Sequence, residues 1–359
     1  MTEPPRSSPA RPASPRIDIV IPHVDGSTPR FEDLCRAHTG EFVPCQLRAL
    51  GELRFVMRSI EKHAPWASIV LVVQSQGHVP AWVNRQTVRI VLHDDFIPSD
   101  LLPTFHFATI AAHLHLIPEL SEQYVYWEDD VLIASDLRQS DLFATDGLLG
   151  LDWATTPIPY GLGRFLGAYQ LNLEETRRSL GRLSGREARA FVYPHAPLPA
   201  TCSSWTAFFT AAIREPSFRS TVTRKSRGNE RLLPTVDPLV LYANWVDDAL
   251  RGRTTLARYG RAAKTLATRL LSGGLRSAKY AVVNNERRMR RNMERLRHAV
   301  RRTTRSRDVV FLNVNDDAYD AWCRPGETPD GSTLNPSSER LLIDTLAELF
   351  PEQSRHEVV

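Results

Sequence analysis

The stretch "YVYWEDDVLI" (residues 124–133) decides the fold. It joins aromatic and β-branched residues, which are typical of a buried strand, to three consecutive carboxylates, Glu128, Asp129 and Asp130. Adjacent carboxylates repel one another and weaken the hydrophobic face of a strand, so we expect them where the strand leaves the core. The stretch therefore predicts a buried strand that ends in a negatively charged turn.

The segments before this strand alternate between strand and helix patterns. We predict strands at 17–22, 67–77 and 88–96, and helices at 51–66 and 105–120. Short connections between them predict an α/β fold with an open, largely parallel sheet flanked by helices. Ligands of such sheets bind beyond the carboxyl ends of the strands, where Asp25, Asp94–Asp95 and Asp129–Asp130 fall.

The second half of the chain has a mixed pattern. Residues 140–250 are predicted to be mostly helical, and 255–305 to form one or two basic amphipathic helices broken at 272–274. A further strand is expected at 308–317, followed by a helix near the C-terminus.

Length and composition predict one large domain over 17–359 after a disordered Pro/Ser/Arg-rich tail over 1–16. The sequence contains no apolar run long enough to span a membrane and no apolar signal core. The four cysteines are widely spaced, which argues against a disulfide framework or a zinc site and favours a cytoplasmic location.

Charge is unevenly spread along the chain. Residues 251–307 carry 18 Lys/Arg against two acidic residues, whereas the whole chain has a net charge of only +4. This basic segment is either a solvated insert, a surface for an anionic phosphodiester-rich polymer, or a peripheral contact with the inner face of an anionic membrane. Nucleic acid is an unlikely partner, because the segment has few aromatic residues and no zinc-finger or RNA-binding signature.

A second strand of the same design supports a metal site. "FLNVNDD" (311–317) places Asn315 and Asp316 after an apolar run. Hard divalent cations take oxygen ligands, so two acidic strand ends favour Mg²⁺ (or Mn²⁺) held by Asp129, Asp130 and Asp316. Alone, the carboxylates at 128–130 would equally suit a solvated turn.

Two loops offer groups for phosphate chemistry. "YPHAPLP" (193–199) holds His195 between prolines, where it could be a general base, contact phosphate, or simply pack at a turn. The loop 223–237 contains Arg227 and Arg231, whose guanidinium groups could bind phosphate oxygens or remain solvated.

Together, these blocks resemble the Stealth family, the hexose-1-phosphoryltransferases of microbial polysaccharide synthesis. The resemblance is carried by "IDIVIPHVDGSTP" (17–29), "GELRFVMRSIEKHAPW" (51–66), "LPTFHFATIAAHLHLIPELSEQYVYWEDDVLI" (102–133), "YPHAPLP" and "FLNVNDD". It implies a nucleotide-sugar glycosyltransferase-like fold, a divalent metal, and transfer of a sugar 1-phosphate from a nucleotide sugar, often UDP-linked, to a hydroxyl of a saccharide acceptor.

The resemblance also implies roles for individual residues. The matched active-site positions are Asp25, His195, Arg231 and Asp316, with Arg54, Arg227, Asn315 and Glu52 expected near the substrates. Glu52 and Arg54 could reach the donor or form an ion pair with each other, and of these two we expect the ion pair.

The sequence departs from the family pattern at several places. Thr28 replaces the family's second aspartate of the first block, and Pro22–His23 replaces a Thr-Trp pair. Glu128 and His106 each replace an asparagine. The alternatives left open are an altered donor or acceptor, a metal-dependent glycosyltransferase that transfers the sugar alone, and a non-catalytic member of the family.

Overall fold

The main body of the protein is a five-stranded sheet. A computed structural model describes residues 16–26, 29–40, 48–74, 79–143, 156–157, 168–185, 191–192, 196–225, 234–247, 275–303, 309–314 and 334–358. The strand order is β3-β2-β1-β4-β8. Their bounds are β1 Ile17–His23, β2 Ser68–Val73, β3 Val88–Leu92, β4 Gln123–Tyr126 and β8 Leu198–Thr201. All neighbours are parallel except β4 and β8, which confirms the predicted open, largely parallel sheet.

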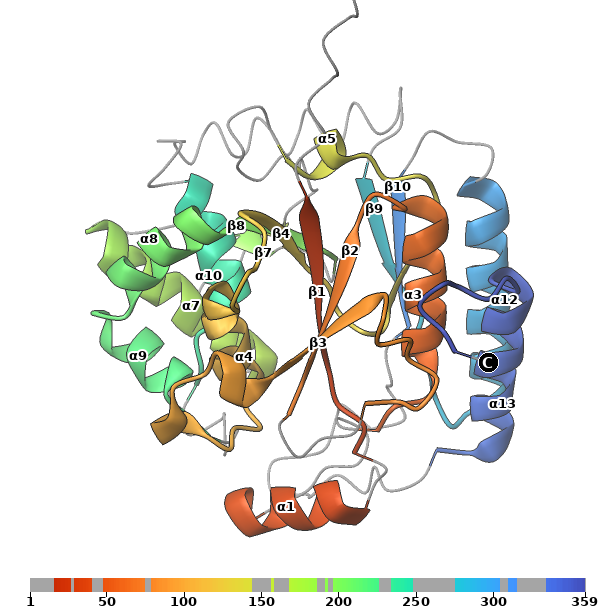
Figure 1. Ribbon diagram of the computed structural model, residues 1–359, viewed down its shortest axis with the longest axis horizontal. Coiled ribbons are helices and arrows are strands. Elements are labelled where there is room, and N and C mark those ends of the chain that lie inside the picture. The colour runs from red at the N-terminus through yellow and green to blue at the C-terminus, as the bar shows by residue number, and fades with distance from the viewer. Residues whose placement is uncertain are drawn as a thin grey trace, which may run out of the picture.

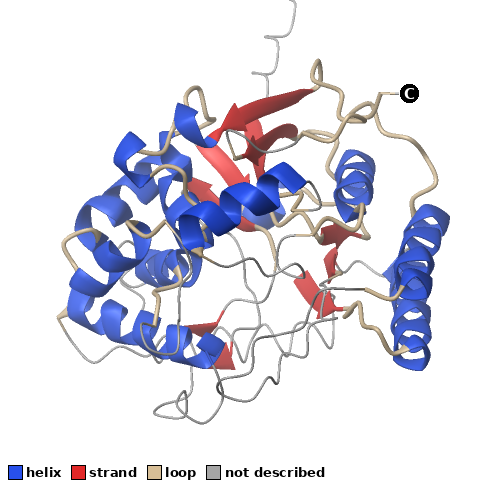
Figure 2. Ribbon diagram, turned by 90° about the horizontal axis from the view of Figure 1, so that it is seen from below, coloured by secondary structure: helices blue, strands red, loops and turns tan. Residues whose placement is uncertain are grey.

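Helices cover both sides of this sheet, which explains why its central strands are continuously apolar (Figures 1 and 2). One group consists of α4 (Phe107–His113), α7 (Ala168–Ser184), α8 (Cys202–Ala212), α9 (Pro216–Val222) and α10 (Pro238–Trp245). The other consists of α3 (Glu52–His63), α12 (Glu286–Thr303) and α13 (Pro336–Leu349). The remaining elements are α1 (Pro29–Thr39), α5 (Gln139–Leu142), β6 (Thr156–Pro157), β7 (Phe191–Val192) and 3₁₀ turns at 93–95, 99–101 and 114–116.

The chain leaves the main sheet after β4 and enters a second one. This three-stranded sheet has the order β5-β10-β9, with β5 at Val131–Ile133, β10 at Val309–Asn313 and β9 at Leu275–Lys279. β5 is antiparallel to β10, and β9 is parallel to it. One prediction needs correction here: Leu275–Lys279 is a strand rather than part of a basic helix. The predicted strand that ends at the carboxylates of 128–130 is confirmed as β4, and β5 follows these carboxylates in the second sheet.

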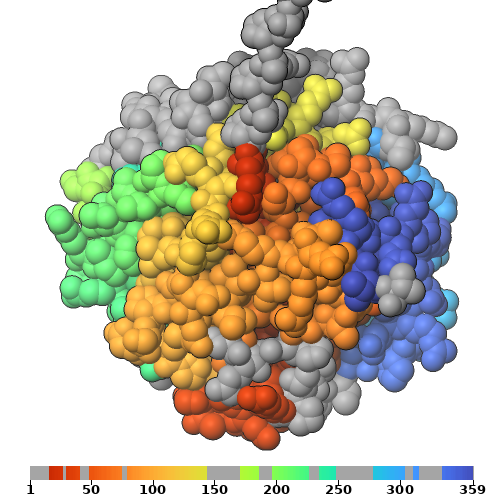
Figure 3. All heavy atoms as spheres, in the orientation of Figure 1, coloured from red at the N-terminus to blue at the C-terminus, as the bar shows by residue number. Residues whose placement is uncertain are grey.

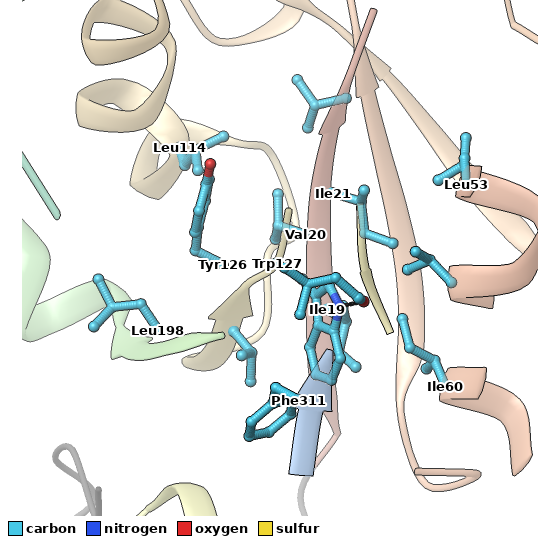
Figure 4. Packing of buried hydrophobic residues seen from close by; sticks show 14 of the residues in the cluster. Ile19, Val20, Ile21, Leu53, Ile60, Leu114, Tyr126, Trp127, Leu198 and Phe311 are labelled. Atoms are coloured by element: carbon cyan, nitrogen blue, oxygen red, sulfur yellow. Dashed lines mark hydrogen bonds between the residues drawn. The ribbon is translucent and has the colours of Figure 1, made fainter. Parts of the chain in front are cut away.

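Trp127 lies where the two sheets meet. Its side chain is fully buried and its ring meets Phe311 of β10 edge to face, with 5.5 Å between the ring centroids. In the close-up of the core, Trp127 and Phe311 lie next to Ile19 of β1 (Figure 4). One continuous apolar core therefore supports both sheets.

The segment after α13 packs back onto α3. Arg58 donates from Nε and Nη2 to the two carboxylate oxygens of Glu357, at 2.6 and 2.9 Å, and from Nη1 to the carbonyl of Phe350. Figure 3 shows this segment against the surface formed by the early part of the chain. Within the described ranges, every helix is too short or too polar to cross a bilayer. The tail at 1–15 and the basic residues 251–274 lie outside those ranges, and the domain boundaries stay a prediction.

We expect Glu357→Gln to lower the free energy of unfolding by roughly 2–3 kcal/mol, because it leaves the Arg58 guanidinium largely buried without its counter-charge. Urea denaturation at neutral pH measures the change. Glu348→Gln is the matched control, since Glu348 pairs with Arg297 and Arg301 at the exposed surface, and its loss should be much smaller. Equal losses in the two variants would contradict the structural importance of the Arg58–Glu357 pair.

Candidate active site at the acidic turn

The acidic turn is fixed by its neighbours on both sides. The backbone N–H of Trp127 donates to the carbonyl of Val20 in β1 at 2.9 Å, and its indole Nε1–H donates to the carbonyl of Val131 in β5 at 2.7 Å. The turn over 128–130 is thereby held between the carboxyl end of β4 and the start of β5. Its three carboxylates are partly exposed, although the residues on either side are buried.

His23, the last residue of β1, contacts the turn directly. Its Nδ1 lies 2.6 Å from Oδ2 of Asp129, and its side chain is only 2 % exposed. Burial by itself would lower the pKa of His23, but the hydrogen bond and the charge of Asp129 outweigh it, so the pKa is raised. The other ring nitrogen, Nε2, is buried and has no partner in the described part of the chain.

The second sheet approaches the same turn through Asp130. Asn313, at the end of β10, donates from Nδ2 to Oδ1 of Asp130 at 2.8 Å, and Val314 donates from its backbone N–H to the Asp130 carbonyl. The amide oxygen of Asn313 is buried and accepts no hydrogen bond from a described residue. The strand predicted from "FLNVNDD" therefore does reach the acidic turn, immediately before Asn315 and Asp316.

Glu52 joins the cluster from the first turn of α3. It is buried and accepts a hydrogen bond from the backbone N–H of Leu50 at 2.6 Å. Burial, and then the negative charge of Asp129, raise the pKa of Glu52 to about 8. The carboxyl group is consequently protonated at neutral pH, and it can donate a hydrogen bond as a neutral acid. Asp25, just after β1, acts on the same cluster, because its charge helps to raise the pKa of His23.

The structure thus brings four of the predicted site residues together: Asp25, Glu52, Asp129 and Asp130. Arg54 lies apart from them, since it pairs with Glu357 at 3.4 Å and stacks on Trp82. The expected Glu52–Arg54 ion pair is therefore wrong. His195, Arg227, Arg231, Asn315 and Asp316 lie outside the described residues, as does Thr28, and their roles stay predictions.

Sequence reasoning missed the roles of His23 and Asn313. His23 was only a departure from a family pattern, although its place at the end of a strand, two residues before Asp25, is a usable signal. Asn313 precedes the predicted Asn315 by two residues and ends the apolar run of the predicted strand, so its place at the end of that strand is the usable signal.

No group of three or more His, Cys, Asp or Glu side chains among the described residues is arranged to hold a metal ion. The donors that are present are nevertheless of the right chemistry. The unpartnered Oδ1 of Asn313 and the carboxylates of Asp129 and Asp130 are hard oxygen ligands, which suit Mg²⁺. An additional ligand would have to come from outside the described ranges.

Comparison with known families identifies the region that carries this turn. Residues 46–150 match the family model "Stealth protein CR2, conserved region 2". The chain therefore carries a conserved region of the Stealth proteins. The matched region includes Glu52, Asp129 and Asp130, whereas His23 and Asn313 lie outside it.

The relatives that the chain resembles are named as polysaccharide phosphotransferases. The chain is 31 % identical over 163 residues to the capsular polysaccharide phosphotransferase WcwK of Streptococcus pneumoniae, and 31 % identical over 163 residues to the receptor polysaccharide phosphotransferase WefC of Streptococcus oralis. Each alignment covers 42 % of this chain and 49 % of the relative, so the chain matches about half the length of these proteins.

Among solved structures, the chain is similar to the galactosyltransferase LgtC in complex with donor and acceptor sugar analogues. The two share 12 % sequence identity with a TM-score of 0.31, over 92 % of this chain and 95 % of that chain. A likeness this distant does not identify a site or a substrate.

The raised pKa values predict how stability depends on pH. A carboxyl whose pKa is higher in the folded than in the unfolded state stabilises the fold fully below the unfolded value, and the contribution is lost as pH rises through the folded value. The same sign applies to His23, whose pKa is also raised. In metal-free buffer we therefore expect the protein to lose stability as pH rises from about 6 to about 9, through the Glu52 pKa of about 8.

Glu52→Gln should flatten this dependence, because glutamine is neutral at every pH in the range. Urea denaturation of both proteins at about pH 6 and about pH 9 measures the change. A wild-type protein whose stability is constant over this range would show that Glu52 is not protonated at neutral pH.

Proposed function

We propose that the protein transfers a sugar 1-phosphate from a nucleotide sugar to a hydroxyl of a saccharide acceptor, forming a phosphodiester in polysaccharide synthesis. The observation that carries the proposal is that Glu52, Asp129 and Asp130 converge in space and all lie in the region that matches conserved region 2 of the Stealth proteins. The converging ends of β1, β4 and β10 provide the edge at which ligands of α/β sheets bind.

The proposed reaction occurs at the phosphorus atom that bears the sugar. The acceptor hydroxyl oxygen forms a bond to this phosphorus, the bond from phosphorus to the bridging diphosphate oxygen breaks, and a nucleoside monophosphate leaves. Positioning and charge stabilisation supply most of the catalysis in phosphoryl transfer. His195 would take the acceptor proton or contact the phosphate, and Arg231, or Arg227 in its place, would steady the transferring group.

A divalent cation, Mg²⁺ or Mn²⁺, is part of the proposal. Asp129, Asp130 and the amide oxygen of Asn313 would hold it, together with Asp316, and its chemistry is to neutralise the diphosphate charge. His23 orients Asp129 by binding Oδ2, which leaves Oδ1 for a ligand. The buried carboxyl of Glu52 lies beside Asp129 and, while protonated, would donate a hydrogen bond to a phosphate oxygen.

The direct test is incubation with a panel of nucleotide sugars, Mg²⁺ and oligosaccharide acceptors, scored by release of nucleoside monophosphate. Asp130→Asn should lower turnover by at least about 100-fold, because it removes charge from the proposed cation site. Asp136→Asn is the matched control, because His63 is the one described residue that this exposed aspartate bonds through its side chain. This variant should turn over like wild type. Release of a nucleoside diphosphate instead would mean that the sugar alone is transferred.

His23 gives an independent prediction about the same site. His23→Ala should lower kcat by roughly 10- to 100-fold, as expected when the partner of a ligating carboxylate is removed. His23→Gln, which can still donate to Asp129, should recover part of the loss. His63→Gln is the control, because His63 makes a comparable bond to Asp136 away from the site, at 3.0 Å. Equal activity in wild type and His23→Ala would show that Asp129 needs no orienting partner.

A further inference from the structure

Helix α12 presents three chemically different faces. Met289, Met293 and Leu296 are buried against the rest of the protein. A second face carries Arg297 and Arg301, which pair with Glu348 of α13. Neither of these faces is available for a ligand.

The third face carries Arg288, Arg291 and Arg295, spaced so that they lie along one side of the helix. These three arginines line an open concavity of about 380 Å³ together with Lys279, Ala281 and Asn292. Among the residues that the structure describes, the lining contains four cationic side chains and no acidic one. No described carboxylate lies within ion-pair distance of the three guanidinium groups. Like charges at this spacing destabilise a helix slightly, and a bound anion would relieve their repulsion.

The wall of the concavity is tied to the second sheet. Asn292 donates from Nδ2 to the carbonyl of Ala281 at 2.6 Å, which fixes α12 against the residues that follow β9. The concavity is therefore formed by α12 together with the residues that follow β9, rather than by a single exposed helix.

The concavity lies one strand away from the acidic turn. Lys279, the last residue of β9, is in register with Asn313, the last residue of β10. Asn313 in turn donates to Asp130. Paired strands are about 4.8 Å apart, so Lys279 and Asn313 are close neighbours. The cationic concavity and the acidic turn therefore lie at the same end of the second sheet.

We propose that this concavity binds phosphate groups of the saccharide acceptor, so that an acceptor chain already containing phosphodiesters is held beside the acidic turn. The inference rests on the proposed function and adds to it the chemical class of the acceptor. Guanidinium groups bind two phosphate oxygens at once, so three of them suit a chain that carries repeated phosphodiesters.

An anionic membrane is the other ligand that a basic helix could meet. A helix that lies in a membrane surface buries an exposed apolar face among the lipids. The apolar face of α12 is occupied by the core, and its free arginines line a concave surface. These features favour a chain that enters the concavity over a flat lipid surface.

The test measures binding to the whole chain by calorimetry, without nucleotide sugar and without metal. The probe is a synthetic oligomer of glucose 1-phosphate whose sugars are joined by phosphodiesters, and the neutral reference is a glucose oligomer of the same length. We expect salt-sensitive binding of the charged oligomer only. The variant Arg288→Gln/Arg291→Gln/Arg295→Gln should bind it roughly 10- to 100-fold more weakly.

The matched control is Arg287→Gln/Arg290→Gln/Arg302→Gln, which removes the same charge from exposed positions of the same helix that do not line the concavity. It should bind like wild type. Replacing the three lining arginines by lysine should retain part of the affinity, and this variant separates loss of charge from loss of folding.

Three results would overturn the proposal: no binding of the charged oligomer by wild type, equal weakening in the lining and control variants, or binding to phosphatidylglycerol vesicles but not to the oligomer. Because the measurement uses no donor, its failure leaves the transferase test intact. Failure of nucleoside monophosphate release likewise leaves the oligomer result standing.

Discussion

The site depends on one constraint: the chain passes from one sheet to another within the four residues 127–130. β4 is fixed to β1 before the passage, and β5 is fixed to β10 directly after it. Trp127 fixes the start of this crossover. Its backbone N–H donates to the carbonyl of Val20, its indole N–H donates to the carbonyl of Val131, and its side chain is fully buried. These two hydrogen bonds hold the backbone at the turn, so the carboxylates that follow lie at the junction of the two sheets. Such rigid support is what a binding site with several ligands requires.

This rigidity has an electrostatic consequence. Carboxylates held close together repel one another. Here protons bound by neighbouring groups reduce that repulsion. His23 gains a proton-stabilising partner in Asp129, while Glu52 keeps its own proton because it is buried next to the same charge. The cluster is therefore less negative at neutral pH than its residue types suggest. An added cation or a phosphate ligand would change these protonation states, which links ligand binding to pH.

The main sheet could be predicted from the sequence because β1, β2 and β3 are aliphatic runs bounded by turn residues. They also follow one another along the chain and pair in that order. The second sheet could not. β9 ("LRSAK") is short, basic and without β-branched residues, so only its pairing with β10 makes it a strand. The same holds for the site. Asp129 and Asp130 stand out in the sequence, but their partners lie 106 and 183 residues away and depend on strand register.

The departures from the Stealth pattern change charge in both directions: Glu128, in place of an asparagine, adds a carboxylate to the acidic turn, whereas the changes at residues 23 and 28 do the opposite. Thr28 stands where the family has a carboxylate, which removes a negative charge from the first block. His23 stands where the family has tryptophan, and its hydrogen bond to Asp129 and the charge of Asp129 raise its pKa despite burial. A proton on His23 offsets the charge of Asp129 and lessens the repulsion of anions at the acidic turn. Arg288, Arg291 and Arg295, one strand away, extend the same trend across the second sheet. The proposed phosphodiester-containing acceptor would meet these cationic groups beside the acidic turn.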